Sequence, residues 1–208
     1  MTPEEKKPLL VDSHCHLDAP EFDADRAEVL SRARAAGVGL MLTAGADLPS
    51  SCRAAELAAA ERDVYAAVGV SPHAAAEVEG DWIEELRNLA GACDRVVAIG
   101  EIGLDTVRSK APSKVQEEVF IAQLALAWEL DLPVVIHCRG ADERMLELLQ
   151  EYSGEGRRRA VMHCFSGDEL LARGALALGY YISFAGSLTY PKARPTRRAA
   201  EQIGRAHV

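Results

Sequence analysis

The sequence predicts an α/β fold of the (β/α)₈ barrel class, incomplete, with about seven strand and helix units and the last strand missing. Two observations carry this prediction. Apolar segments alternate with helical ones, which is typical of a parallel sheet covered by helices. Polar residues also follow at least five of the apolar segments. In a barrel, the functional site is assembled at the carboxyl ends of the strands.

An open, doubly wound sheet is the alternative fold. Such a sheet collects its ligand site at one switch point, whereas here the polar residues follow many strands. No Gly-rich dinucleotide fingerprint and no phosphate-binding loop follows a predicted strand. The barrel is therefore favoured.

Each predicted strand is a short apolar run, rich in β-branched and aliphatic residues. The predicted strands are residues 9–17, 38–43, 64–70, 96–99, 133–136, 160–162 and 179–184. Helices are predicted at residues 20–36, 49–62, 82–89, 115–130 and 142–152, with a last basic helix from about Pro191. Gly37 ends the first helix, Asp81 caps the third, and Gly154 and Gly156 close the fifth.

Length and composition indicate one globular domain, which we place at residues 1–202. The chain has 208 residues and 49% hydrophobic content, enough for a sizeable core. No apolar run approaches the length of a membrane span, and residues 1–7 do not resemble a signal peptide. Five cysteines without framework spacing favour reduced thiols, so we expect a cytoplasmic protein.

The formal net charge of -9 disfavours a broad basic face for duplex nucleic acid, because phosphate contacts supply most of such affinity. It leaves a nuclease possible, since metal ions bring positive charge and a few basic side chains can meet a phosphate. Basic residues group at residues 157–159 and 192–198, and we interpret both groups as solvated surface.

Five of the six histidines lie at predicted strand ends. His14 and His16 are two residues apart, so in an extended segment both imidazoles point to the same side. The strand-end set is His14, His16, His73, Glu101, His137 and His163. Because strand ends converge in a barrel, these residues can share one or two ions. Metal-free histidines in the core or at the surface are the alternative, but packing does not explain why they concentrate at strand ends.

Imidazoles combined with a carboxylate suit zinc, manganese, iron and related divalent ions. We assign His14 and His16 to one ion, His137 and His163 to a second, and Glu101 to the bridge between them. Two such ions, about 3.5–4 Å apart, can activate a water and hold the attacking and leaving oxygens of a phosphoester displacement. The expected cofactors are two divalent ions, with Zn, Mg and Mn as candidates.

Four segments carry a resemblance to a known family. They are Asp-Ser-His-Cys-His-Leu at 12–17, Gly-Glu-Ile-Gly-Leu-Asp at 100–105, Val-Ile-His-Cys-Arg at 135–139 and His-Cys-Phe-Ser-Gly at 163–167. In this order they resemble the signatures of the TatD family of metal-dependent deoxyribonucleases, and the similarity extends through residues 181–192. The resemblance implies an amidohydrolase-type barrel with divalent metals. It also implies hydrolysis of phosphodiester bonds in DNA, as an exonuclease acting at 3′ ends or on single strands.

The resemblance supports the metal-ligand assignment residue by residue. Glu101, Arg139 and His73 are the catalytic candidates, with Arg139 expected to steady a phosphate. The sequence departs from the family pattern at Ser71, where a histidine is usual, and at Gly140, where an aspartate usually follows the arginine. The loop at residues 106–108 lacks the usual aromatic residue.

The end of the chain also departs from the family. Related chains continue to a final strand whose aspartate is a metal ligand, and this chain ends at Val208 without one. Residues 203–208 resemble the translation of a sequencing adapter. We therefore expect a longer gene product, with a non-native tail at residues 203–208.

Two other functions compete with the nuclease. A small-molecule amidohydrolase would use the same metals to polarise a carbonyl. In that group a carbamylated lysine often bridges the metals, and neither the fourth nor the fifth strand ends in lysine. An inactive barrel fragment is the third possibility, since exposed edges on the first and seventh strands would promote oligomerisation or aggregation.

Several neighbours of the proposed ligands have predicted supporting roles. Cys15, Cys138 and Cys164 each adjoin a ligand in sequence, so on a strand they should point away and pack. Asp12 and Asp105 are expected to orient ligands, which is a recognised use of an acid near a metal-bound histidine.

Overall fold

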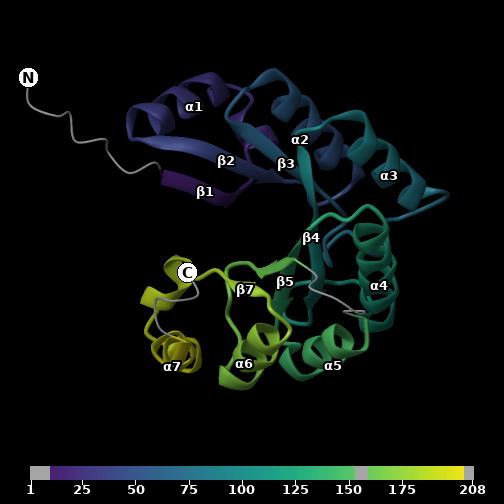
Figure 1. Ribbon diagram of the computed structural model, residues 1–208, viewed down its shortest axis with the longest axis vertical. Coiled ribbons are helices and arrows are strands. Elements are labelled where there is room, and N and C mark those ends of the chain that lie inside the picture. Colours follow the sequence, from purple (N-terminus) through teal and green to yellow (C-terminus); the bar gives the residue numbers. More distant parts are fainter. Residues whose placement is uncertain (1–9, 153–158, 204–208) are drawn as a thin grey trace, which may run out of the picture.

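The computed structural model describes residues 10–152 and 159–203. Within them, seven strands form one sheet in chain order, and every neighbouring pair is parallel. The strands are β1 (Leu10–Cys15), β2 (Val38–Ala44), β3 (Val64–Val68), β4 (Val96–Asp105), β5 (Val134–Arg139), β6 (Ala160–Met162) and β7 (Tyr181–Ile182). The sheet curls into an open arc with β1 and β7 at its two ends (Figure 1).

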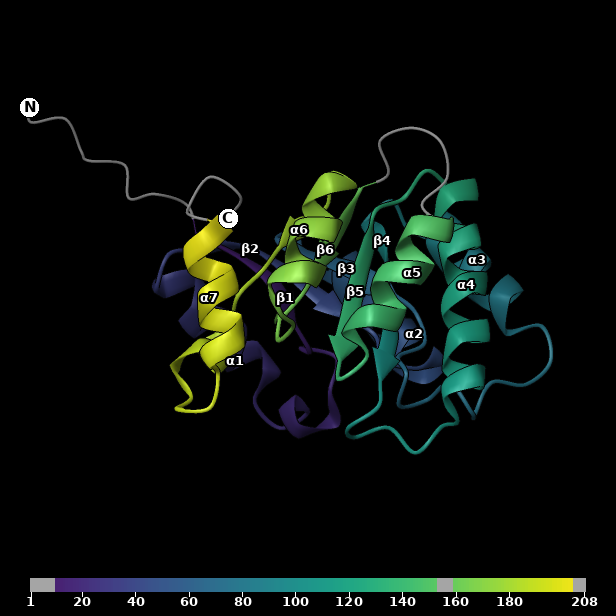
Figure 2. The ribbon, with the colours of Figure 1, turned by 90° about the horizontal axis from the view of Figure 1, so that it is seen from below.

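Helices connect the strands and cover the outer side of the arc (Figure 1). They are α1 (Arg26–Ala35), α2 (Leu48–Ala60), α3 (Trp82–Ala92), α4 (Ser113–Glu129), α5 (Asp142–Tyr152), α6 (Glu169–Ala177) and α7 (Arg194–Ile203), with the short 3-10 helices η1 (Pro20–Phe22) and η2 (Gly186–Thr189). Figure 2 shows α4, α5 and α6 side by side over the strands. None of the helices in the described ranges is both long and apolar enough to cross a bilayer.

Alternating strand side chains pack into two apolar clusters on opposite faces of the sheet. The larger cluster joins strand residues such as Ile99 to helix residues such as Leu30 and Leu86, so it fills the layer between sheet and helices. The smaller cluster contains strand residues only, and therefore lies on the concave face. Its members are Ala44, Ala67, Ala98 and Val135, with Leu42 and Val161 packed against them.

Two strands have irregular pairing where the chemistry lies. The register of β4 with β5 shifts within residues 99–102, which include Glu101. The register of β1 with β2 shifts within residues 12–15, which include His14. Such irregularities bend a strand locally and re-aim side chains, and they are common next to functional sites.

The predicted barrel-type architecture is confirmed as a curled half-barrel, and the doubly wound alternative is wrong. A doubly wound sheet reverses its strand order at a switch point, whereas these strands are strictly sequential. All seven predicted strands are present, but β4 runs on to Asp105 and β7 shortens to Tyr181–Ile182. The extension of β4 follows from its pairing with the whole length of β5, through Asp105 and Arg139.

The predicted helices needed more correction. The segment predicted as one helix at residues 20–36 begins as η1, and its α-helix starts only at Arg26. Asp81 occupies the N-cap position of α3 but makes no side-chain capping bond. Helix α6 had no counterpart in the prediction. Gly154 and Gly156, predicted to close α5, lie outside the described residues.

The two edges of the sheet expose apolar side chains. On β1, Leu10 and Val11 are 52% and 58% exposed, and on β7 Tyr181 is 65% exposed. These residues lie on edge strands, because within the described ranges no strand pairs with the free side of β1 or of β7. The interior strands β3, β4 and β5, in contrast, are almost entirely buried.

Candidate metal centre

The carboxylate of Glu101 lies among four imidazoles, two at each oxygen. His14 Nε2 and His16 Nε2 are 3.2 and 3.7 Å from Oε2. His137 Nδ1 and His163 Nε2 are 2.8 and 3.1 Å from Oε1. The five residues predicted as metal ligands therefore meet in one place. They also divide into the two predicted pairs, with the carboxylate between them.

The spacing of the first pair suits a shared ion. The Nε2 atoms of His14 and His16 are 3.3 Å apart. Two nitrogens bound to one tetrahedral zinc at about 2.0–2.1 Å would lie about 3.3 Å apart. The opposite ring nitrogen of His16, Nδ1, is 2.8 Å from the carbonyl oxygen of Ala44. That contact fixes Nδ1 as the donor and leaves the Nε2 lone pair directed at Glu101.

The rings of the two pairs also pack on each other. His14 and His163 stack with ring centroids 3.9 Å apart and an interplanar angle of 11°. His137 and His163 lie at 5.4 Å. Asp12, predicted to orient a ligand, accepts the backbone N–H of His14 at 3.2 Å. This contact orients the main chain at His14 and does not reach its ring.

The electrostatics of the cluster favour a cation. Burial by itself would raise the pKa of Glu101, but the close imidazoles of His137, His14 and His163 outweigh it and hold that pKa far below its usual range. Burial lowers the pKa of His163 in spite of the nearby carboxylate, whereas at His137 burial is outweighed by Glu101 and Asp105, which raise its pKa. An ionised carboxylate beside a neutral imidazole is the protonation pattern that a divalent ion requires.

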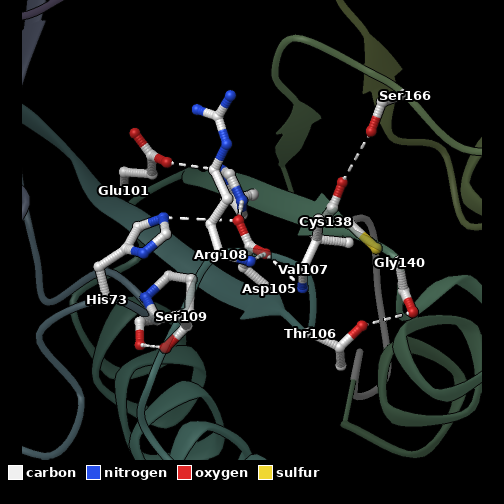
Figure 3. A network of polar contacts seen from close by, with 12 residues as sticks. His73, Glu101, Asp105, Thr106, Val107, Arg108, Ser109, Cys138, Gly140 and Ser166 are labelled. Carbon is white, nitrogen blue, oxygen red and sulfur yellow. Dashed lines mark hydrogen bonds and ion pairs between the residues drawn. The ribbon is translucent and has the colours of Figure 1, made fainter.

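A second polar group adjoins the first through His137. Its Nε2 is 3.1 Å from Asp105 Oδ2, and His73 Nε2 is 3.4 Å from the same oxygen (Figure 3). The other oxygen of Asp105 accepts the backbone N–H groups of Val107 and Arg108, at 2.8 and 2.7 Å. The Asp105 side chain is fully buried. It contacts the Nε2 atom of His137, whereas Glu101 lies at the Nδ1 atom of the same ring.

A cavity of about 1000 Å³ opens beside the cluster. The five predicted ligands line it, and so do Arg108, Arg139 and Lys192. Within the described ranges, the side chains of these three basic residues form no hydrogen bond or ion pair. They are therefore available to an anionic ligand in the cavity.

The catalytic candidates differ in their positions. Glu101 lies at the centre of the cluster, and Arg139 reaches the cavity wall from the end of β5. His73 does not line the cavity, and it reaches the cluster only through Asp105. The sequence placed Lys192 on a solvated surface and gave Arg108 no role, yet both line the cavity.

Of the three cysteines that adjoin a ligand in sequence, two follow the predicted packing. Cys15 Sγ faces the carbonyl oxygen of Leu42 at 3.3 Å, and burial raises the pKa of Cys15 to about 12. Burial likewise raises the pKa of Cys138, so both groups remain thiols. Cys164, however, is exposed and lines the cavity. Strand β6 ends at Met162, so the strand alternation on which that prediction rested does not extend to Cys164.

Comparison with known proteins agrees with this geometry. The sequence model of the family described as TatD related DNase matches residues 11–208. The chain belongs to the TatD family. YabD of Bacillus subtilis, named an uncharacterized metal-dependent hydrolase, is 38% identical over 198 residues, which cover 94% of this chain and 76% of that protein. The resemblance found in the sequence is therefore confirmed.

Other TatD proteins give the same result. A protein named 3'-5' ssDNA/RNA exonuclease TatD, from Cronobacter sakazakii, is 41% identical over 177 residues, covering 85% of this chain and 66% of that protein. Among solved structures, the TatD homologue YjjV of Escherichia coli superposes with a TM-score of 0.84 at 34% identity. That match covers 91% of this chain and 73% of YjjV. The chain thus spans about two thirds to three quarters of these relatives.

Proposed function

We propose that this TatD protein is a divalent-metal-dependent hydrolase that cleaves phosphodiester bonds of DNA from the 3′ end of single strands. The observation that carries the proposal is the Glu101 carboxylate with two histidines at each oxygen. The curated relatives support the substrate class, since one of them is named for 3'-5' exonuclease activity on single-stranded DNA and RNA.

The donor set favours two ions. His14 and His16 would hold one ion and His137 and His163 the other, with Glu101 contributing an oxygen to each. When bound, such a pair of ions lowers the pKa of a coordinated water and stabilises the charge on both oxygens of the displacement. Four imidazoles with one carboxylate suit zinc better than magnesium, which prefers oxygen ligands.

The basic side chains in the cavity would bind the phosphate groups. The chain carries a formal net charge of -9, so an anionic strand gains little from the protein as a whole. Arg108, Arg139 and Lys192 place positive charge at the cavity instead. Arg139, at the end of β5 next to the cluster, is the proposed contact for the phosphate that is cleaved. His73 acts through Asp105, in a supporting role.

Small-molecule amidohydrolysis is the second candidate. The metal ligands alone do not distinguish it, because the same ions polarise a carbonyl. The position between the histidine pairs is held by a glutamate, not by the lysine that often bridges metals in that group. Three basic side chains that have no partner among residues 10–152 and 159–203 line one cavity, which also favours a polyanion over a neutral cyclic amide.

A nuclease assay with single-stranded oligonucleotides tests the proposal. The chain is incubated with manganese, zinc or magnesium and a strand labelled at the 5′ end, and we expect a ladder of products shortened from the 3′ end. Chelation of the metal should stop the reaction, and Arg139→Gln should slow it. Asp47→Asn is the matched control, because Asp47 only caps α2 and asparagine caps equally well.

Two outcomes would count against the proposal. If none of the three metals supports nucleotide release, the phosphodiesterase function is wrong for this chain. If cleavage is equally fast in chelator, the activity does not come from the metal centre.

A further inference from the structure

The ring of His137 lies between two carboxylates. Its Nδ1 is 2.8 Å from Glu101 Oε1, and its Nε2 is 3.1 Å from Asp105 Oδ2. A neutral imidazole has one N–H and one lone pair, and only the lone pair can bind a metal. The partner of Nε2 therefore decides whether Nδ1 is available to the ion beside Glu101.

Asp105 is held in one orientation by its surroundings. Its Oδ1 accepts the N–H groups of Val107 and Arg108 at 2.8 and 2.7 Å. Its backbone N–H donates to Gln116 Oε1 at 2.9 Å, and Gln116 Nε2 donates back to its carbonyl at 3.2 Å. With Oδ1 occupied in this way, Oδ2 is the oxygen that faces His137.

We propose that Asp105 is a positioning residue for the metal centre. Asp105 accepts a hydrogen bond from the Nε2–H group of His137. It thereby fixes the tautomer whose Nδ1 lone pair points at the ion. His73 Nε2 lies 3.4 Å from the same oxygen. This inference rests on the proposed metal centre, and it does not depend on the nucleic-acid substrate.

A third ion between His73, Asp105 and His137 is the competing interpretation. Their ligand atoms all lie within 4.8 Å of one another. Such an ion would need the lone pair of His137 Nε2, which is a proton donor in the proposed tautomer. The two interpretations therefore predict different ring protonation and different numbers of bound ions.

Asp105→Asn separates positioning from a purely structural role. The single oxygen of the amide must face the N–H groups of Val107 and Arg108, so its NH₂ group faces His137. Nε2 then has to accept, and the proton moves to Nδ1. The variant keeps the bonds that shape the loop and reverses the tautomer of the ligand.

The test combines nitrogen NMR of the histidine rings with zinc titration of the whole chain. In the zinc-loaded wild type we expect His137 to carry a proton on Nε2 that is hydrogen-bonded to Asp105, and in Asp105→Asn we expect that hydrogen bond to be lost. His137→Gln assigns the resonance. Zinc should bind to one site of the variant at least about 10-fold more weakly, the usual effect of losing such a partner. The other site should keep its affinity, and Asp47→Asn should change neither.

Several results would overturn the inference. A zinc-loaded wild type without a proton on His137 Nε2 does so even if the variant fails to fold. Unchanged zinc affinity in Asp105→Asn does so as well. If the wild type binds three ions and the variant binds two, Asp105 is instead a ligand of a third ion, together with His73 and His137. A wild type that binds two ions but releases no nucleotides overturns the proposed substrate alone. A chain that binds no ion overturns the metal centre and this inference together.

Discussion

The two histidine pairs around Glu101 come from differently supported parts of the sheet. His137 lies in the second half of β5 and His163 follows β6, and both strands have a neighbour on each side. His14 and His16 lie at the end of β1, which pairs only with β2. The difference in exposure lies in His16, whose side chain is 45% exposed, whereas those of His14, His137 and His163 are 16%, 18% and 8% exposed.

The two pairs also differ in the hydrogen bonds that hold their rings. In the inner pair, His137 is bonded to the buried carboxylate of Asp105. In the outer pair, His16 is bonded to a backbone carbonyl, and the buried Nδ1 atoms of His14 and His163, one from each pair, have no partner among the described residues. A ligand held by its surroundings loses less conformational freedom when a metal binds. We therefore expect the inner ion to bind more tightly.

The largest effect should come from the residue that both pairs share. Glu101→Gln removes the negative charge that both ion sites share, so we expect the variant to bind neither ion. Nuclease activity should fall more than about 100-fold, a larger loss than removal of a residue that only orients a ligand would cause. Metal analysis after desalting measures the first change, and the oligonucleotide assay measures the second. Retention of both ions would show that Glu101 is not the bridge.

Removing one ligand from each pair sharpens the comparison. Zinc titration of the wild type should show two steps of unequal affinity, and His163→Ala should lose the tighter step. His14→Ala should lose the weaker step and keep the tighter one. If the two variants give the same titration curve, the ions are not held by separate pairs.

The exposed edges give a smaller, concentration-dependent effect. An unpaired strand edge with apolar side chains is a site for pairing with another chain, so we expect the protein to self-associate. Val11→Lys and Tyr181→Lys should shift sedimentation toward the monomer. Leu170→Lys, which replaces an exposed apolar residue on helix α6, should not. A wild type that sediments as a monomer at all concentrations contradicts the prediction.

The smallest effect concerns the ion pair between Arg34 and Asp63. Arg34 on α1 bonds to Asp63 at the start of β3, with N–O distances of 2.5 and 2.7 Å, and holds the pKa of Asp63 below its usual 3.8. Both groups are near solvent, so Arg34→Gln should lower the free energy of unfolding by only about 0.5 kcal/mol at neutral pH. Because the pKa of Asp63 is lower in the folded protein, its ionised carboxylate stabilises the fold above pH 3.8. That stabilisation is lost as the pH falls through the pKa of the folded state. Urea unfolding should therefore show the two proteins converging below pH 3.8, and a constant difference would contradict this assignment.

Much of the centre could be predicted because residues at the carboxyl ends of barrel strands lie close together, whatever their separation in the sequence. Once His137 and His163 were recognised as following apolar strands of a parallel sheet, the barrel rule placed them together with Glu101. Arg108 could not be found in this way. It lines the cavity because the backbone turns around the carboxylate of Asp105, a contact that spacing along the chain does not reveal. Lys192 follows η2, a short helix that no sequence pattern indicated.

By itself, the sequence determined the order of strands and helices and the residue types that reach the strand ends. Period-two alternation and apolar runs are local properties, so they can be recognised along the chain. Only the tertiary structure decided which oxygen of Glu101 faces which histidines, and that Asp105 lies behind His137. Those relations depend on the curl of the sheet and on the register of neighbouring strands. Both arise from packing between segments far apart in the chain, and no local pattern encodes them.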